Sequence, residues 1–219
     1  NRDFGHRFEN RKNYTSLNEY NRLAGVELIQ NRVDLAHIIE AKEIVLHMQL
    51  PYIELREDED FKKKYWEQAF KTFDELKPYC RTRGVKIAIE NLLCTPKQEQ
   101  MDQFDTLFER YDFDFMGFCF DSGHGSMVCV DDPLFFAKRY KERIIALHLQ
   151  DTDGIAPELI EDGMAALKHD KHALPFTGII NWDDLAKIVA RSQYKLPVTL
   201  EVHLKSDTYD QEMFNLKDA

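Results

Sequence analysis

The sequence predicts an α/β fold in which a parallel β-sheet is covered by helices. Short, continuously apolar segments alternate along the chain with longer amphipathic segments, and such strands are typical of parallel sheets that are buried on both faces. Four apolar segments also stop on a side chain that can bind a metal ion: Lys86–Glu90, Gly117–Asp121, Arg143–His148 and Pro197–Glu201. Because an unpaired buried charge is costly, we expect these four ends to meet at one site.

Apolar periodicity and capping residues predict the helices. The expected helices span residues 17–41, 58–82, 95–111, 133–140 and 182–192, and a loop with a short helix spans residues 151–169. Ser16 is expected to cap the first helix, Gly84 to close the second and Asn181 to cap the last. In the first helix, Leu35 and Ile39 widen the apolar face.

The expected strands span residues 44–48, 86–90, 117–121, 144–149 and 198–202, with a weaker candidate near residues 170–174. After the third of these strands, Gly123 and Gly125 permit a tight turn, so that Asp121 and His124 can face one pocket. The stretch from Ser206 onward is polar and is expected to be peripheral.

An open doubly wound sheet and a closed (β/α)8 barrel both fit this order of elements. An open sheet concentrates its site at one crevice, whereas ligands at the carboxyl ends of several strands converge in a barrel. We therefore expect a TIM barrel that forms a single domain over residues 1–219. Because a complete barrel has eight strands and about 250 residues, we expect the first one or two strand–helix units to be missing from this chain.

Composition excludes several classes of protein. The 219 residues are 43% hydrophobic, which indicates a globular protein, and no apolar run reaches the roughly 20 residues of a membrane span. The net charge of −10 opposes binding to nucleic acid. The four cysteines show no CxxC spacing and the chain opens without a signal region, so a cytoplasmic protein is expected. A homo-oligomer is compatible with these observations.

Glu90, Asp121, His148 and Glu201 are the candidate ligands of one metal ion. Carboxylate and imidazole together suit Mn, Zn, Co or Mg. Taken singly, each has an ordinary alternative, because Glu90 could be a solvated loop residue, Asp121 a turn residue and His148 a core histidine. Their shared position at successive strand ends favours the metal site.

A second set of candidates comprises His47, His124, Asp170 and His172. The spacing of two puts Asp170 and His172 on one side of an extended segment, and His47 ends its own strand. These residues are candidates for a second metal ion or for contacts with the substrate. Outside this set, His203 is expected to be a surface residue. The remaining histidines, His6, His37 and His169, are expected to be solvated.

Six short motifs resemble the xylose isomerase-like barrel superfamily. They are Ile-Glu-Asn at 89–91, Phe-Asp-Ser-Gly-His at 120–124, Leu-His-Leu-Gln-Asp at 147–151, Asp-Lys-His-Ala-Leu-Pro-Phe-Thr-Gly at 170–178, Ile-Asn-Trp at 180–182 and Leu-Glu-Val at 200–202. The superfamily includes sugar-phosphate isomerases and epimerases, inosose dehydratases, ketose 3-epimerases and the AP endonuclease IV group. The resemblance implies that Glu90, Asp121, His148 and Glu201 hold the main divalent metal.

Within the superfamily the motifs are compatible with two kinds of site. In the AP endonucleases, the positions that match His47, His124, Asp170 and His172 hold further zinc ions, whereas many sugar isomerase-like members carry the same loop with one metal. The AP endonucleases have one further metal-binding histidine on an earlier strand, and His6 is the only candidate for that position in this chain. The ketose 3-epimerases have an arginine shortly after the metal-binding histidine, and residues 150–154 of this chain contain none.

The leading hypothesis is a divalent-metal-dependent sugar, sugar-phosphate or polyol isomerase or epimerase. Glu90 and Glu201 would be catalytic and would move a proton through a metal-stabilised enediolate, while His124 orients a substrate hydroxyl. The expected partner is a small sugar or polyol. The alternatives are a zinc-dependent phosphodiesterase of the AP endonuclease IV type and a non-catalytic binding barrel.

Overall fold

The structure is a computed structural model that describes residues 13–93, 95–159, 163–203, 206 and 208–218. His6 and Cys94 lie outside the described residues. The chain divides into two compact units, of which the first comprises Asn1–Ile44 with Leu50–Ile87 and the second Val45–Gln49 with Ala88–Ala219.

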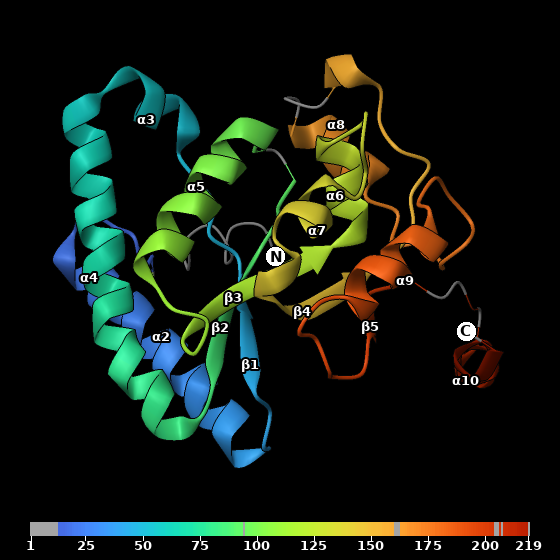
Figure 1. Cartoon of the computed structure of the whole chain (residues 1–219), viewed down its shortest axis with the longest axis horizontal. Helices are drawn as coiled ribbons and strands as arrows, with labels where there is room; N and C mark the ends of the chain where they lie inside the picture. The colour runs from blue at the N-terminus through green and yellow to red at the C-terminus, as the bar shows by residue number, and fades with distance from the viewer. Residues whose placement is uncertain (1–12, 94, 160–162, 204–205, 207, 219) are drawn as a thin grey trace. The chain divides into compact units, whose positions relative to one another are not determined.

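Five strands form one sheet in which the spatial order follows the chain (Figure 1). They are β1 (Glu43–Leu46), β2 (Lys86–Glu90), β3 (Met116–Asp121), β4 (Ile144–Leu149) and β5 (Thr199–Leu200). The pairs β3–β4 and β4–β5 are parallel, which confirms the expected parallel sheet and the position of each main strand. The weaker strand expected near residues 170–174 is a single antiparallel bridge between Asp151 and Ala173.

The first unit is built on two long helices that lie side by side, α2 (Glu19–Ile38) and α4 (Glu59–Arg83) (Figure 1). The prediction that Ser16 caps α2 is wrong, because Asn18 is the N-cap. The hydroxyl of Ser16 accepts a hydrogen bond from the backbone N–H of Asn18. Leu35 and Ile39 are exposed. The apolar face of α2 is therefore narrower than its hydrophobic pattern indicates.

Gly84 closes α4 as expected, with the left-handed backbone that a glycine adopts at little cost (φ 65°). A short helix that the sequence did not indicate, α3 (Tyr52–Glu57), precedes α4. Among the described residues, no helix is long and apolar enough to cross a membrane.

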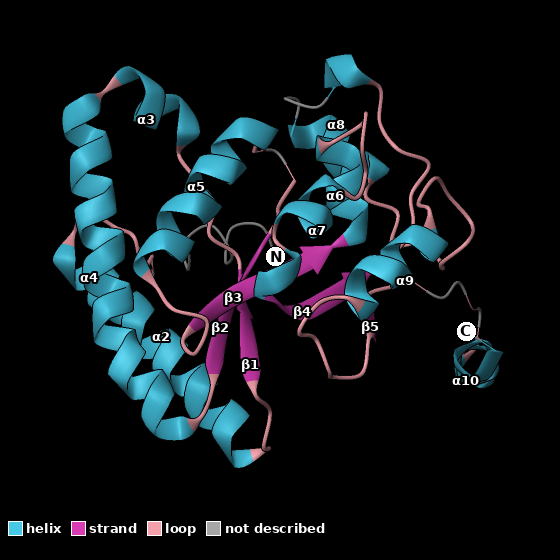
Figure 2. Ribbon diagram, in the orientation of Figure 1, coloured by secondary structure: helices cyan, strands magenta, loops and turns pink. Residues whose placement is uncertain are grey.

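The second unit alternates strands with helices (Figure 2). The helices are α5 (Lys97–Arg110), α6 (Ser122–Val128), α7 (Phe135–Arg139), α8 (Gly163–His169), α9 (Trp182–Ala190) and α10 (Tyr209–Asp218), with short 3-10 helices at η1 (Lys141–Arg143) and η2 (Pro157–Leu159). Asn181 caps α9 as expected. The helix α10 lies in the polar stretch for which the sequence indicated no element.

The helix α6 positions Asp121 and His124 in the site. The expected tight turn at Gly123 and Gly125 is wrong, because both glycines lie inside this helix and neither has a positive φ. Asp121 is the N-cap, and its Oδ1 accepts a hydrogen bond of 2.7 Å from the backbone N–H of His124. The helix therefore brings Asp121 and His124 together, as the turn was expected to do.

The core beneath the site is formed by Ala88, Cys119, Ile145 and Ala146, with Val45 and Phe113 packed against it. Every residue of β3 is buried. The strand ends that carry the polar side chains thus rest on a well-packed apolar base, which fixes their direction.

Candidate active site

The four candidate ligands of the main metal ion converge. Glu90 ends β2, Asp121 ends β3 and His148 lies in β4, with Glu201 directly after β5. Asp121 and His148 are direct partners in the parallel register. One ligand atom from each of the four lies within 4.8 Å of all the others. We call these four residues the strand-end cluster.

Glu90 is a deeply buried member of the strand-end cluster, with a side chain only 1% exposed. Its Oε2 lies 2.9 Å from Nε2 of His47 and its Oε1 lies 3.1 Å from Nδ1 of His148. Burial alone would raise the pKa of Glu90, but the hydrogen bonds from His148 and His47 outweigh burial and lower the pKa to about 2. Glu90 is therefore an anion held from both oxygens.

His148 faces two carboxylates with one nitrogen. Its Nδ1 lies 2.8 Å from Oε2 of Glu201 as well as near Glu90. The hydrogen bond of this nitrogen goes to Glu90. Oε2 of Glu201 lies at ion-pair distance from the same nitrogen but is buried without a hydrogen-bond partner among the described residues. Burial also raises the pKa of the neighbouring Asp121 to about 6.

Three carboxylates around one imidazole form a site that a divalent cation fits. The buried and unpaired oxygen of Glu201 would gain a partner, and the mixed oxygen and nitrogen donors are those that Mn, Zn, Co and Mg use in proteins. Sγ of Cys119 also lies within 4.8 Å of ligand atoms of Glu90 and His148.

His124, Asp170 and His172 come together in a second group, which we call the bridging-aspartate cluster. Oδ2 of Asp170 lies 3.6 Å from Nε2 of His124 and 3.2 Å from Nε2 of His172. Oδ1 of Asp170 is buried and has no hydrogen-bond partner within the described part of the chain. Among the described residues, the groups whose possible metal-ligand atoms all lie within 4.8 Å of one another do not include the bridging-aspartate cluster.

The backbone determines which nitrogen of each imidazole carries hydrogen. Nδ1 of His124 lies 2.9 Å from the carbonyl oxygen of Asn91, and Nδ1 of His172 lies 2.8 Å from that of Glu201. A carbonyl oxygen only accepts, so each Nδ1 is protonated and each Nε2 faces Asp170. Burial lowers the pKa of His124, but the charges of Asp121 and Asp170 outweigh it and raise the pKa to about 9.

His47 contacts the strand-end cluster, through Glu90. It follows β1 directly, and its side chain is 60% exposed although its Nε2 bonds Glu90. A ligand can reach the exposed ring from solvent.

His172 has a strained backbone, with φ at 47°, a region that residues other than glycine rarely occupy. Its N–H donates to Oε1 of Gln150 at 3.1 Å, and its carbonyl oxygen accepts from the N–H of His203 at 2.8 Å. Such strain persists only where several contacts impose it. The surface residue His203 also places its ring 4.8 Å from that of His172.

Three buried polar residues around the site were missed by the sequence reasoning: Asn91, Gln150 and Asp151. The side chain of Asn91 bonds both the N–H and the carbonyl oxygen of Asp121 at 2.9 Å. Asp151 accepts from the indole N–H of Trp182 at 2.8 Å. Asn91 and Gln150 stand directly after a strand end and Asp151 follows Gln150. This position next to the ligands was the signal that could have found them.

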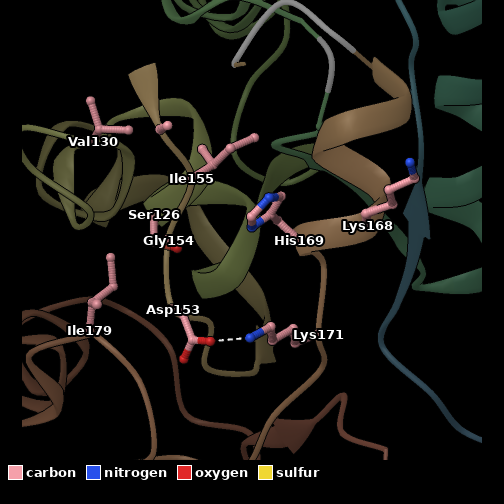
Figure 3. Close-up of a pocket in the computed structure, with 10 residues that line it drawn as sticks. Ser126, Val130, Asp153, Gly154, Ile155, Lys168, His169, Lys171 and Ile179 are labelled. Atoms are coloured by element: carbon pink, nitrogen blue, oxygen red, sulfur yellow. Dashed lines mark hydrogen bonds and ion pairs between the residues drawn. The ribbon is translucent and has the colours of Figure 1, made fainter. Parts of the chain in front are cut away.

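A pocket of about 540 Å³ is lined by residues from the end of α8 and from the segment after β4 (Figure 3). Its polar lining includes Lys168, His169 and an ion pair between Lys171 and Asp153, and its apolar lining includes Val130, Ile155 and Ile179. None of the eight predicted site residues lines it. His169, which was expected to be solvated, is one of the residues that line this pocket.

The fold and the converging strand ends define a TIM-barrel protein with a polar site at the carboxyl ends of its strands. The sequence matches the family of the xylose isomerase-like TIM barrel over residues 4–219, and the chain belongs to this family.

Relatives in sequence share part of their length with this chain. An uncharacterized protein of Sinorhizobium fredii is 34% identical over 193 residues, which are 88% of this chain and 57% of that protein. An inosose dehydratase of Bacillus cereus is 24% identical over 180 residues, which are 77% of this chain and 59% of the relative. The chain thus spans less than two thirds of the length of either relative.

Solved structures support the fold. A D-tagatose 3-epimerase-like protein superposes with a TM-score of 0.61 at 17% identity, covering 99% of this chain and 82% of that chain. An L-ribulose 3-epimerase superposes with a TM-score of 0.55 at 15% identity, covering 93% of this chain and 63% of that chain.

Proposed function

We propose that this chain belongs to a divalent-metal-dependent isomerase or epimerase that acts on a sugar, sugar phosphate or polyol. The observation that carries the proposal is the convergence of Glu90, Asp121, His148 and Glu201 within 4.8 Å. The similarity to epimerases in structure and to inosose dehydratases in sequence supports the substrate class.

The strand-end cluster would hold the cation, which when bound supplies Lewis-acid polarisation of a carbonyl or hydroxyl oxygen. The chain's own residues would then transfer a proton at the carbon next to a carbonyl. General acid–base groups of this kind contribute roughly 10²–10⁴-fold to the rate. The two glutamates are the candidates for this role, because a carboxylate can ligate through one oxygen and keep the other available.

The two glutamates are not equally accessible. The side chain of Glu201 is 44% exposed and that of Glu90 is 1% exposed. Glu201 is therefore the group that a substrate carbon reaches first. A proton-transfer role for Glu90 requires that it give up the hydrogen bond from His47, because this bond holds one of its oxygens.

His124 and His172 would orient substrate hydroxyl groups. Each keeps its Nδ1 on a backbone carbonyl oxygen, so Nε2 is presented in a fixed direction. Asp170 lies between the two rings and can accept from a hydroxyl through its unpaired Oδ1. Fixed donors and acceptors of this kind supply the orientation that a polyol substrate needs.

The test is an activity screen of the full-length protein with ketoses, aldoses, their phosphates and inososes, run in D₂O with Mn²⁺, Co²⁺, Mg²⁺ or Zn²⁺. Deuterium incorporation at the carbon next to the carbonyl, with an isomeric product, supports the proposal. Loss of water from the same substrate would assign a dehydratase, which begins with the same proton removal. Absence of exchange with every substrate and metal would refute both.

The bridging-aspartate cluster favours a second candidate function, a phosphodiesterase of the AP endonuclease type. Two imidazole nitrogens face Oδ2 of Asp170 there, and Oδ1 of the same carboxylate has no hydrogen-bond partner among the described residues. Such a group suits a further cation and two-metal chemistry. Cleavage of abasic DNA with two or three zinc ions bound would support this function. A protein that binds a cation but turns over neither substrate would support a non-catalytic barrel.

A further inference from the structure

Gln150 connects the two clusters. It follows β4 directly and is completely buried. Its side-chain nitrogen lies 3.3 Å from Oδ1 and 3.2 Å from Oδ2 of Asp121. Its side-chain oxygen accepts the backbone N–H of His172 at 3.1 Å. One amide thus contacts a member of the strand-end cluster and the backbone of the bridging-aspartate cluster.

The position of this amide is set from its own backbone. The N–H of Gln150 donates to the hydroxyl of Ser122 at 3.0 Å, and that hydroxyl donates to the carbonyl oxygen of Gln150 at 2.6 Å. Ser122 opens α6, whose N-cap is Asp121. The residue that orients Asp121 is therefore anchored to the helix that Asp121 caps.

Gly123 leaves the space that the amide occupies. A Cβ atom at Gly123 would lie 2.5 Å from Cδ and 2.7 Å from Oε1 of Gln150, closer than atoms that are not bonded can approach. The glycine is required for this close approach, since its backbone is an ordinary helical one.

Only an amide can make both contacts. A carboxylate at this position could accept from His172 but could not donate to Asp121, and an apolar side chain could do neither. The amide also adds no charge beside the three carboxylates of the strand-end cluster, where another buried anion would be costly.

We propose that Gln150 is a positioning residue that orients the Asp121 carboxylate for cation binding and couples it to the segment of His172. The cation-binding half rests on the proposed function, whereas the coupling to His172 stands on the contacts of the amide alone. Partners of metal ligands typically contribute 10–100-fold to metal affinity.

The test compares Gln150→Met with Gln98→Met in the full-length protein. The control Gln98 also donates to a carboxylate, that of Asp102 at 2.8 Å, but on the exposed face of α5. Mn²⁺ affinity is measured by the EPR signal of free Mn²⁺, and the imidazole resonances of His172 are followed by ¹H–¹⁵N NMR. Circular dichroism establishes that each variant is folded.

The proposal expects Gln150→Met to weaken Mn²⁺ binding by about 10–100-fold and to shift the His172 resonances, with neither change in Gln98→Met. Gly123→Ala displaces the amide without altering its chemistry and is expected to do the same, so it replaces Gln150→Met if that variant does not fold. Unchanged Mn²⁺ affinity would overturn the orienting role of Gln150, and unchanged His172 resonances would overturn the coupling.

Failure of the proposed function is separable from failure of this inference. If the unmodified protein binds none of Mn²⁺, Co²⁺, Mg²⁺ and Zn²⁺, the metal-dependent function and the orienting role both fall. The His172 resonances still decide whether the amide couples the two clusters. If Mn²⁺ binds and responds as expected but no sugar is turned over, the positioning role stands and the proposed reaction is wrong.

Discussion

Nδ1 of His148 lies 2.8 Å from Oε2 of Glu201, yet the oxygen has no hydrogen-bond partner among the described residues. The ring nitrogen is already bonded to Glu90. Because the hydrogen bond of the ring goes to Glu90, the buried Oε2 of Glu201 keeps lone pairs that can bind a cation held by these side chains. This relationship is the basis of the first prediction.

Glu201→Gln is expected to weaken cation binding strongly and to reduce turnover by roughly 10²–10⁴-fold, because the amide loses the charge but keeps the size of the side chain. The fold is expected to be unchanged. Mn²⁺ titration, steady-state kinetics and circular dichroism measure the three effects. The control is Glu109→Gln on the exposed face of α5. Full activity in Glu201→Gln would show that Glu201 is not part of the catalytic site.

His172→Asn distinguishes the two candidate functions. Asparagine is chosen because it tolerates the positive φ of this position (47°) better than alanine does. A single-cation isomerase is expected to lose activity only mildly, since His172 then contacts substrate alone. A multi-zinc phosphodiesterase would lose a ligand and with it most of its activity and part of its zinc content, which elemental analysis detects.

Gly25→Ala is expected to destabilise the first unit. Alanine in a helix is ordinarily up to about 1 kcal/mol better than glycine, but here its Cβ would lie 2.5 Å from the backbone nitrogen of Tyr14. The backbone cannot yield as a flexible side chain can, so a cost of about 1–3 kcal/mol is expected.

Chemical denaturation measures this change in the free energy of unfolding. Arg32→Ala on the exposed face of the same helix is the control and is expected to stay within about 0.5 kcal/mol of the unmodified protein. A more stable Gly25→Ala variant would mean that Tyr14 does not approach the helix this closely.

Glu19 makes the first unit sensitive to acid. Hydrogen bonds from Arg22 and Lys71 hold the pKa of Glu19 well below its usual range, so the folded state releases this proton more readily than the unfolded state. The stabilisation is present above the unfolded pKa of about 4.3 and is lost as the pH falls through the folded value.

Glu19→Gln is therefore expected to be less stable than the unmodified protein at neutral pH, with the difference shrinking in acid. Denaturation curves recorded at several pH values measure this difference, and Glu27→Gln on the exposed side of the helix serves as the control. A difference that grows in acid would show that the sign is wrong.

The strands and the strand-end cluster could be predicted because each signal is local. An apolar run that stops on a carboxylate or imidazole is visible in the sequence at Glu90 and Asp121, and parallel strands bring such ends together by their geometry. The convergence of Glu201 follows from the same rule, although β5 itself has only two residues.

The supporting residues could not be predicted, because their roles depend on neighbours far along the chain. The position of Gln150 after a strand end makes it a candidate, but its role is defined only when His172 and Asp121 are placed beside it. Gly123 was assigned to a turn on its conformational freedom, whereas the structure uses its lack of a side chain. Leu35 has the right period for a buried face and is exposed.

The most direct test of the central claim is elemental analysis of the gently purified full-length protein, before and after reconstitution with a divalent metal. Glu201→Gln is analysed in parallel. The proposed single site predicts about one Mn, Co, Mg or Zn ion per chain, and a clear loss of that ion in the variant. A protein that retains no metal even after reconstitution, or a variant that retains as much as the unmodified protein, would contradict the assignment of these four residues as a metal site.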